Sequence, residues 1–155
     1  MRTPSLARTL VACLAAAILG GCGHNPFEVA TSALKAGEAR WKLHRPQNYS
    51  FTVQRNCFCG NTNTLRVEVH GDTPVSITSV IPGQTADTTG YTGYLTIDQI
   101  FATLHAIVAD KPAQFDGAYE ATYGYPIRVD IDRVLNAADD ELIVLVGSFL
   151  PGTTQ

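Results

Sequence analysis

The sequence predicts an α+β fold in which one antiparallel sheet of about six strands carries two helices on one face. Two stretches repeat apolar residues at three- and four-residue steps, which is typical of helices that cover a core. Six shorter stretches either alternate apolar and polar residues or are apolar throughout, and turn-forming residues separate them. The order of these stretches is helix, three strands, helix, three strands, and no sequence repeat accompanies it.

The first helix is predicted over residues 28–43. Pro46 blocks its continuation, because the residue before a proline disfavours the helical conformation. Residues 22–27 are expected to form a short tether, so that a single domain spans residues 28–150. One stripe of the helix carries its apolar and small residues, which are Val29, Ala30, Ala33, Leu34, Gly37 and Trp41.

Three strands in a meander are predicted next, over residues 49–59, 65–70 and 75–81. Gly60 and Gly71 mark the turns between them. A polar loop rich in threonine and glycine follows at residues 82–93, and it is long enough to carry a function. One parity of the first strand is apolar and comprises Tyr49, Phe51, Val53, Cys57 and Cys59.

The second helix is predicted to begin after Thr96, because Thr96 and Gln99 fit a capping box. Lys111 and Pro112 close it. Its apolar face comprises Ile97, Ile100, Phe101, Leu104, Ile107 and Val108. Three more strands are predicted over residues 118–123, 127–132 and 141–149. Residues 142–146 are apolar without interruption, which predicts a strand buried on both faces or nearly so.

The N-terminal residues are typical of an export signal. Residues 1–8 carry two arginines and no acidic residue, and residues 9–19 form an apolar run that is too short to span a bilayer. The Leu-Gly-Gly-Cys string at residues 19–22 resembles the lipobox of bacterial lipoproteins. We therefore expect residues 1–21 to be removed and the thiol of Cys22 to be lipidated. The alternative is an ordinary signal peptide whose removal leaves Cys22 free.

Removal of residues 1–21 leaves 155 − 21 = 134 residues and takes away Arg2 and Arg8. Nine basic residues then face 14 acidic ones, so the net charge is 9 − 14 = −5. This charge argues against nucleic-acid binding and against electrostatic adhesion to anionic lipid. The N-terminal lipid is therefore expected to hold the protein to a membrane, on the periplasmic or cell-surface side. Gly23, in place of an aspartate after Cys22, favours the outer membrane.

Cys57 and Cys59 are the most distinctive chemical feature of the domain. A structural disulfide fits an oxidising compartment; the alternatives are two reduced thiols in the core, or a metal or thiol-redox site. On a regular strand the two Cα atoms would be about 6.5–7 Å apart, at the long limit of disulfide geometry. A bend helped by Gly60 is therefore needed. Two thiolates are too few for a closed zinc site.

The remaining candidate residues favour binding over catalysis. The tyrosines Tyr123 and Tyr125 of the Tyr-Gly-Tyr-Pro turn, with Tyr91 and Tyr94 of the long loop, are expected to form an exposed contact surface. The alternative is a purely structural tight turn. No nucleophile elbow or phosphate-binding loop is present, so we expect no catalytic residue, metal or cofactor. Solvated charges are expected at Asp130, Asp132, Asp139, Asp140 and Glu141, which lack the spacing of a calcium loop.

Several of these segments together resemble a family of bacterial exported proteins known only as a domain of unknown function. The resemblance covers about residues 36–149, and Glu120 stands where that family usually has aspartate, which preserves the charge. It implies the fold and export but no activity. The pattern is also similar to PepSY-like and β-lactamase-inhibitor-like modules, which bind or inhibit proteins. The segments are Trp41, Pro46–Phe51, Cys57–Cys59, Thr96–Phe101 and Tyr119–Asp132.

The sequence thus predicts a lipid-anchored cell-envelope protein that is a non-enzymatic binding module with an envelope protein as its partner. Two alternatives remain open. One is a thiol-redox or metal-binding site at Cys57 and Cys59, and the other is a small ligand bound between the sheet and the helices.

Overall fold

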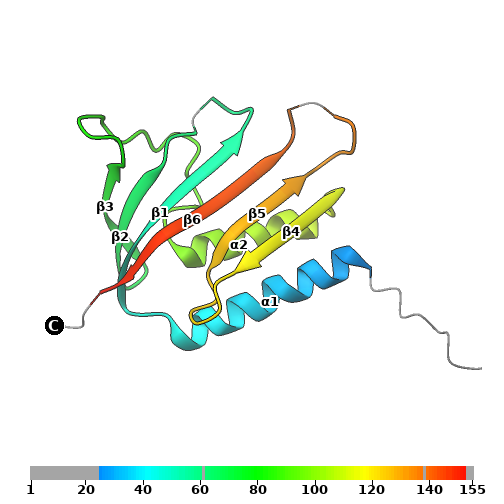
Figure 1. Cartoon of the computed structure of the whole chain (residues 1–155), viewed down its shortest axis with the longest axis horizontal. Coiled ribbons are helices and arrows are strands. Elements are labelled where there is room, and N and C mark those ends of the chain that lie inside the picture. The colour runs from blue at the N-terminus through cyan, green and yellow to red at the C-terminus, as the bar shows by residue number, and fades with distance from the viewer. Residues whose placement is uncertain (1–24, 61, 138, 153–155) are drawn as a thin grey trace, which may run out of the picture.

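The computed structural model describes residues 25–60, 62–137 and 139–152, so the predicted signal peptide and Cys22 lie outside the described residues. The chain has the predicted α+β fold, with two helices and a six-stranded antiparallel sheet in the order α-βββ-α-βββ (Figure 1). The elements are α1 (Pro26–His44), β1 (Asn48–Cys57), β2 (Leu65–His70), β3 (Thr73–Ser79), α2 (Ile97–Ala109), β4 (Gln114–Tyr119), β5 (Pro126–Asp132) and β6 (Leu142–Pro151).

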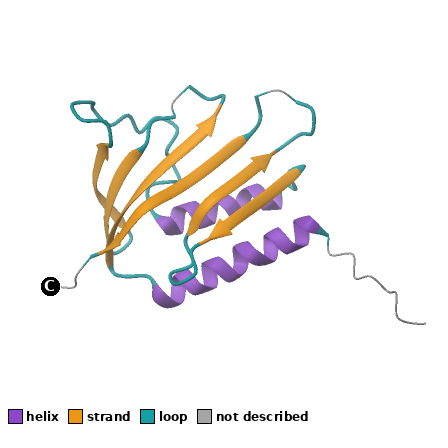
Figure 2. Ribbon diagram, in the orientation of Figure 1, coloured by secondary structure: helices purple, strands orange, loops and turns teal. Residues whose placement is uncertain are grey.

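The strands lie in the order β3-β2-β1-β6-β5-β4, which places β1 and β6 at the centre. Both helices cover the same face of this sheet (Figure 2). The Trp41 ring of α1 and the Tyr49 ring have centroids 5.2 Å apart, and the Tyr49 hydroxyl accepts a hydrogen bond from the Ile97 N–H of α2 at 3.2 Å. The opposite face, which we call the open face, carries no helix among the described residues.

The core fills the space between the helices and the covered face. Full burial of each large apolar side chain contributes about 1.5–3 kcal/mol, so this layer supplies most of the driving force for folding. Its largest fully buried side chains include Trp41, Tyr91, Phe51, Phe101, Leu34, Leu65, Ile97, Ile100 and Leu104.

The helix α1 begins two residues earlier than predicted. The Asn25 side chain accepts a hydrogen bond from the Phe27 N–H at 3.1 Å, and Pro26 occupies the first turn, where a missing N–H is harmless. The expected tether of residues 22–27 therefore includes two helical residues, and its expected end at Phe27 is wrong. Within the described residues, no helix is long and apolar enough to cross a membrane.

The capping prediction for α2 is confirmed. Thr96 is the N-cap, and its hydroxyl accepts a hydrogen bond from the Gln99 N–H at 3.0 Å. Gln99 in turn accepts from the Leu95 N–H at 3.1 Å. Asp98, in the first turn of α2, accepts from Trp41 Nε1 at 3.2 Å and forms an ion pair with Arg45 at 2.8 Å. These contacts tie the end of α1 to the start of α2.

Two strand predictions are displaced along the chain. β4 ends at Tyr119, four residues before the predicted end at Tyr123. The following residues form a turn, which is closed by a hydrogen bond of 2.8 Å from the Glu120 N–H to the Tyr125 carbonyl. β4 is an edge strand with Gly117 at an inward position, so its apolar alternation is weak. β3 ends at Ser79, two residues before the predicted end, and Ile81 is exposed.

The strand β6 differs from a doubly buried strand. Leu142, Val144 and Val146 face the core, whereas Ile143 and Leu145 face the open side and are half-buried. Its pairing with β1 is irregular between Ser50 and Thr52. The uninterrupted apolar run of β6 is therefore buried on one face only. Among the described residues, no helix covers the open face, where Ile143 and Leu145 lie.

Candidate functional site

The structure joins Cys57 and Cys59 in a disulfide with Cα atoms 5.1 Å apart. This separation lies inside the usual disulfide range because β1 ends at Cys57 and the chain bends through residues 58–60. Gly60 has a φ of 84°, a left-handed conformation that glycine adopts readily. The predicted bend is therefore present, while the predicted continuation of the strand to Cys59 is wrong.

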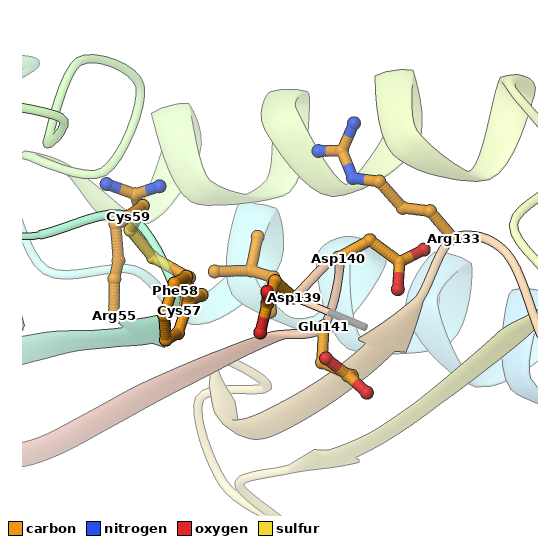
Figure 3. A pocket seen from close by; sticks show the side chains of 9 residues that line it. Arg55, Cys57, Phe58, Cys59, Arg133, Asp139, Asp140 and Glu141 are labelled. Carbon is orange, nitrogen blue, oxygen red and sulfur yellow. A yellow bond between two sulfur atoms is a disulfide. The ribbon is translucent and has the colours of Figure 1, made fainter. Parts of the chain in front are cut away.

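The disulfide borders a cavity of about 200 Å³ at one end of the sheet, which we call the loop end (Figure 3). The loop end comprises the β1–β2 connection, residues 58–64, and the β5–β6 connection, residues 133–141. The two connections are neighbours because Cys57 pairs with Leu142. Charged groups of both signs share the wall with the disulfide, so the cavity is not a dry ligand pocket; the lining residues are Arg55, Cys57, Phe58, Cys59, Arg133, Asp139, Asp140, Glu141 and Leu142.

Tyr91 and Tyr94 are buried, with exposed fractions of 0% and 5%, so the prediction that they form a contact surface is wrong. The Arg55 guanidinium lies 4.8 Å from the Tyr94 ring centre and 5.7 Å from that of Tyr91. The Tyr91 hydroxyl accepts from the Arg55 N–H at 3.3 Å and donates to the Asn63 carbonyl. Burial raises the pKa of Tyr91. These tyrosines hold the long loop against β1.

Arg55 occupies the same parity of β1 as Tyr49, Phe51 and Val53, so the alternation alone does not identify its role. A cation at an inward position needs partners, since an unpaired buried charge is costly. The two tyrosines and the Gly90 carbonyl supply them. A charged residue among the inward apolar positions of β1 is the sequence feature that indicates a covering segment, and here that segment is the long loop.

Tyr123 and Tyr125 are half-buried and belong to an aromatic cluster at the end of the sheet opposite the loop end. Both rings pack on Phe149, with centroids 5.0 and 4.7 Å away. The cluster comprises Trp41, Tyr49, Tyr123, Tyr125 and Phe149. The structural interpretation of the Tyr-Gly-Tyr-Pro turn therefore explains most of what the two tyrosines contact.

Glu120 braces this turn. Its carboxylate accepts hydrogen bonds from the N–H groups of Thr122 at 2.9 Å and Tyr123 at 2.5 Å. Partial burial acts to raise the pKa of Glu120, but these hydrogen bonds outweigh it and lower the pKa below the usual value. The carboxylate thus has a structural role at the position where the resembling family usually carries aspartate.

Two of the acidic residues near the loop end have different partners. Asp130 forms an ion pair with Arg128, and Asp140 accepts from the Val134 N–H at 2.6 Å. Within the part of the chain that the structure describes, no group of three or more His, Cys, Asp or Glu residues could hold a metal ion.

The open face has a neutral centre between charged flanks. Outward side chains of the central strands include Thr52 and Gln54 of β1, and Ile143 and Leu145 of β6, with Gln54 opposite Leu145. The neighbouring strand β2 places Arg66 opposite Thr52 and Glu68 opposite Ser50. On the other side, β5 places Arg128 opposite Leu145 and Asp130 opposite Ile143.

One family model matches most of the chain. The family model of DUF6174, a family of unknown function, matches residues 33–151. The chain belongs to this family. No curated protein and no solved structure matches the chain. Membership in DUF6174 agrees with the resemblance to a domain of unknown function, over nearly the same residues.

Proposed function

We propose that this DUF6174 protein is a lipid-anchored cell-envelope protein that binds a protein partner through the open face of its sheet and catalyses no reaction. The export signal and the lipobox-like residues 19–22 support the anchor. Two acyl chains or more give stable membrane attachment, which a surface of net charge −5 would not provide. Gly23 supports the outer membrane as the site of attachment, on its periplasmic or cell-surface side.

The charge pattern of the open face carries the binding proposal. Protein interfaces are depleted of charge at their centre and polar at their rim. The open face has this arrangement, since uncharged residues line β1 and β6 while Arg66 and Glu68 lie on one flank and Arg128 and Asp130 on the other. The half-buried Ile143 and Leu145 supply apolar area at the centre.

The other two candidate functions have less support. A small ligand between the sheet and the helices would need free space there. That space holds fully buried side chains such as Trp41, Phe51 and Leu104. For thiol exchange at Cys57 and Cys59, the supporting observation is that Cys59, one of the two disulfide-bonded residues, is exposed. A disulfide that restrains the loop end explains the same observation without a reaction.

Photo-crosslinking in the native envelope tests the binding proposal. A photoreactive benzoylphenylalanine at Thr52 is expected to give a discrete protein adduct, and the same group at Lys35, exposed on α1, serves as the control. Adding Leu145→Arg to the Thr52 probe is expected to abolish the adduct, because a charge then lies at the centre of the face. Equal adducts from Lys35, or no effect of Leu145→Arg, would contradict binding by the open face.

A further inference from the structure

Three exposed apolar side chains lie at the loop end, one in the β1–β2 connection and two in the β5–β6 connection. Phe58 is 82% exposed, and Val134 and Leu135 are 60% and 63% exposed. Phe58 follows the end of β1, and its neighbour Cys57 pairs with Leu142 at the start of β6. Phe58 lines the same cavity as Arg133 of the β5–β6 connection, the connection that also carries Val134 and Leu135. Large apolar side chains exposed at one end of a molecule are available for contact with a protein or a membrane.

The backbone on both sides of this patch is restrained. The disulfide between Cys57 and Cys59 flanks Phe58 directly. In the other connection, the Val134 N–H donates to Asp140 and the Val134 carbonyl accepts from the Ala137 N–H at 3.0 Å. The apolar side chains are therefore held outward by local bonds and cannot turn into the core without breaking them.

The N-terminus of α1 lies at this same end of the molecule. Figure 1 shows that α1 starts beside the beginning of β4 and runs toward the opposite end, where Trp41 meets Tyr49 and Phe149. Cys22 precedes the N-cap Asn25 by three residues, which span about 11 Å at most. An acyl chain on Cys22 would therefore keep the loop end close to the bilayer.

We propose that Phe58, Val134 and Leu135 insert into the surface of the bilayer that holds the lipid anchor. This inference rests on the lipid anchor of the proposed function. The acyl chains supply the affinity, and the patch fixes the orientation of the domain. The strands β1, β5 and β6 begin or end at the loop end, so the open face stands away from the lipid and remains accessible to a partner.

The charges beside the patch select the headgroup. Asp139, Asp140 and Glu141 lie in the connection that carries Val134 and Leu135, and they outnumber the two cations, Arg55 and Arg133, that line the same cavity. These carboxylates are repelled by anionic headgroups at short range. The surface that fits the loop end is therefore one of zwitterionic lipid, such as phosphatidylethanolamine.

The test places benzoylphenylalanine at Phe58 in the full-length lipidated protein, reconstituted in phosphatidylethanolamine vesicles and, separately, left in its own envelope. Leu43 is the matched control, because it is 77% exposed and lies at the other end of α1. We expect a lipid adduct at Phe58 that is several-fold more abundant than at Leu43 and that falls when phosphatidylglycerol is added. Loss of the adduct is also expected on replacing Val134 and Leu135 by serine.

Several outcomes overturn the inference. Equal lipid adducts at the two positions, a protein adduct at Phe58 in the envelope in place of lipid, or a yield that rises with phosphatidylglycerol each contradict it. The mass of the N-terminal peptide separates this failure from that of the anchor. An unmodified Cys22 removes the anchor itself, whereas an acylated Cys22 without a lipid adduct at Phe58 removes only the bilayer contact.

Discussion

The two ends of the sheet carry aromatic side chains in opposite environments. At one end, Trp41, Tyr49 and Phe149 pack edge to face or tilted against one another, and Trp41 is fully buried. At the loop end, Phe58 is 82% exposed. The aromatic cluster forms because a helix end, two strand ends and a turn converge there. Phe58 lies beyond the end of β1, next to the disulfide, where no comparable aromatic packing is seen among the described residues.

An irregularity in the backbone of β6 directs Phe149 into the aromatic cluster. Ser148 has a φ of 46°, and the pairing of β6 with β1 shifts between Ser50 and Thr52. This bulge places Phe149 on the covered face together with Val146, although the two residues are an odd number of positions, three, apart. Without the bulge, the alternation would direct Phe149 to the open face.

The comparison is tested most strongly by truncating one aromatic residue at each end. Trp41→Ala is expected to lower the free energy of unfolding by about 3–5 kcal/mol, because it leaves a large cavity. Loss of the hydrogen bond from Trp41 to Asp98 adds to the effect. Phe58→Ala is expected to change the free energy of unfolding by no more than about 0.5 kcal/mol, as for other exposed sites. Chemical denaturation measures both, and a large effect of Phe58→Ala would show that Phe58 has a folding role.

Two glycines with nearly the same backbone sharpen the comparison. Gly60 at the loop end and Gly124 at the other end have φ values of 84° and 86°. A Cβ at Gly60 meets nothing within 4 Å, so Gly60→Ala carries only the left-handed strain of about 1–2 kcal/mol. A Cβ at Gly124 meets the Gly37 carbonyl and lies 3.0 Å from the Trp41 nitrogen.

Gly124→Ala is therefore expected to destabilise the protein by a further 1–3 kcal/mol or so, because overpacking against backbone cannot be relieved by a side-chain rotation. The difference between the two unfolding free energies isolates the close approach of α1 to the turn. Equal losses would mean that α1 moves away from the turn without penalty, and the tight packing would then not determine stability.

The sequence contained the element order but not the contacts that depend on distant segments. Alternation identified β2 and the first half of β1, because the inward residues there are apolar, whereas Arg55 interrupts the pattern in the second half of β1. It misplaced β4, whose inward positions include Gly117 and whose sequence lacks a strong pattern. The capping pair of α2 was predictable because it is local. The burial of Tyr91 and Tyr94 was not, because it depends on Arg55, far away in the chain.

The disulfide should contribute little to stability, although it is the most distinctive chemical feature. Cys57 and Cys59 close a loop of three residues, and the chain-entropy relation gives about 1.6 kcal/mol for so short a loop, before any strain is subtracted. Replacing both cysteines by serine is thus expected to lower the free energy of unfolding by no more than about that amount.

The same double variant separates restraint of the loop from thiol exchange. If the disulfide restrains Phe58, the variant loses part of the lipid adduct formed by a probe at position 58, and the parent protein does not turn over a dithiol substrate. A sustained exchange with dithiols in the parent, absent from the serine variant, would instead establish thiol chemistry at the loop end. A stability loss as large as that of Trp41→Ala would make the disulfide part of the folding core, and the contrast between the two ends would disappear.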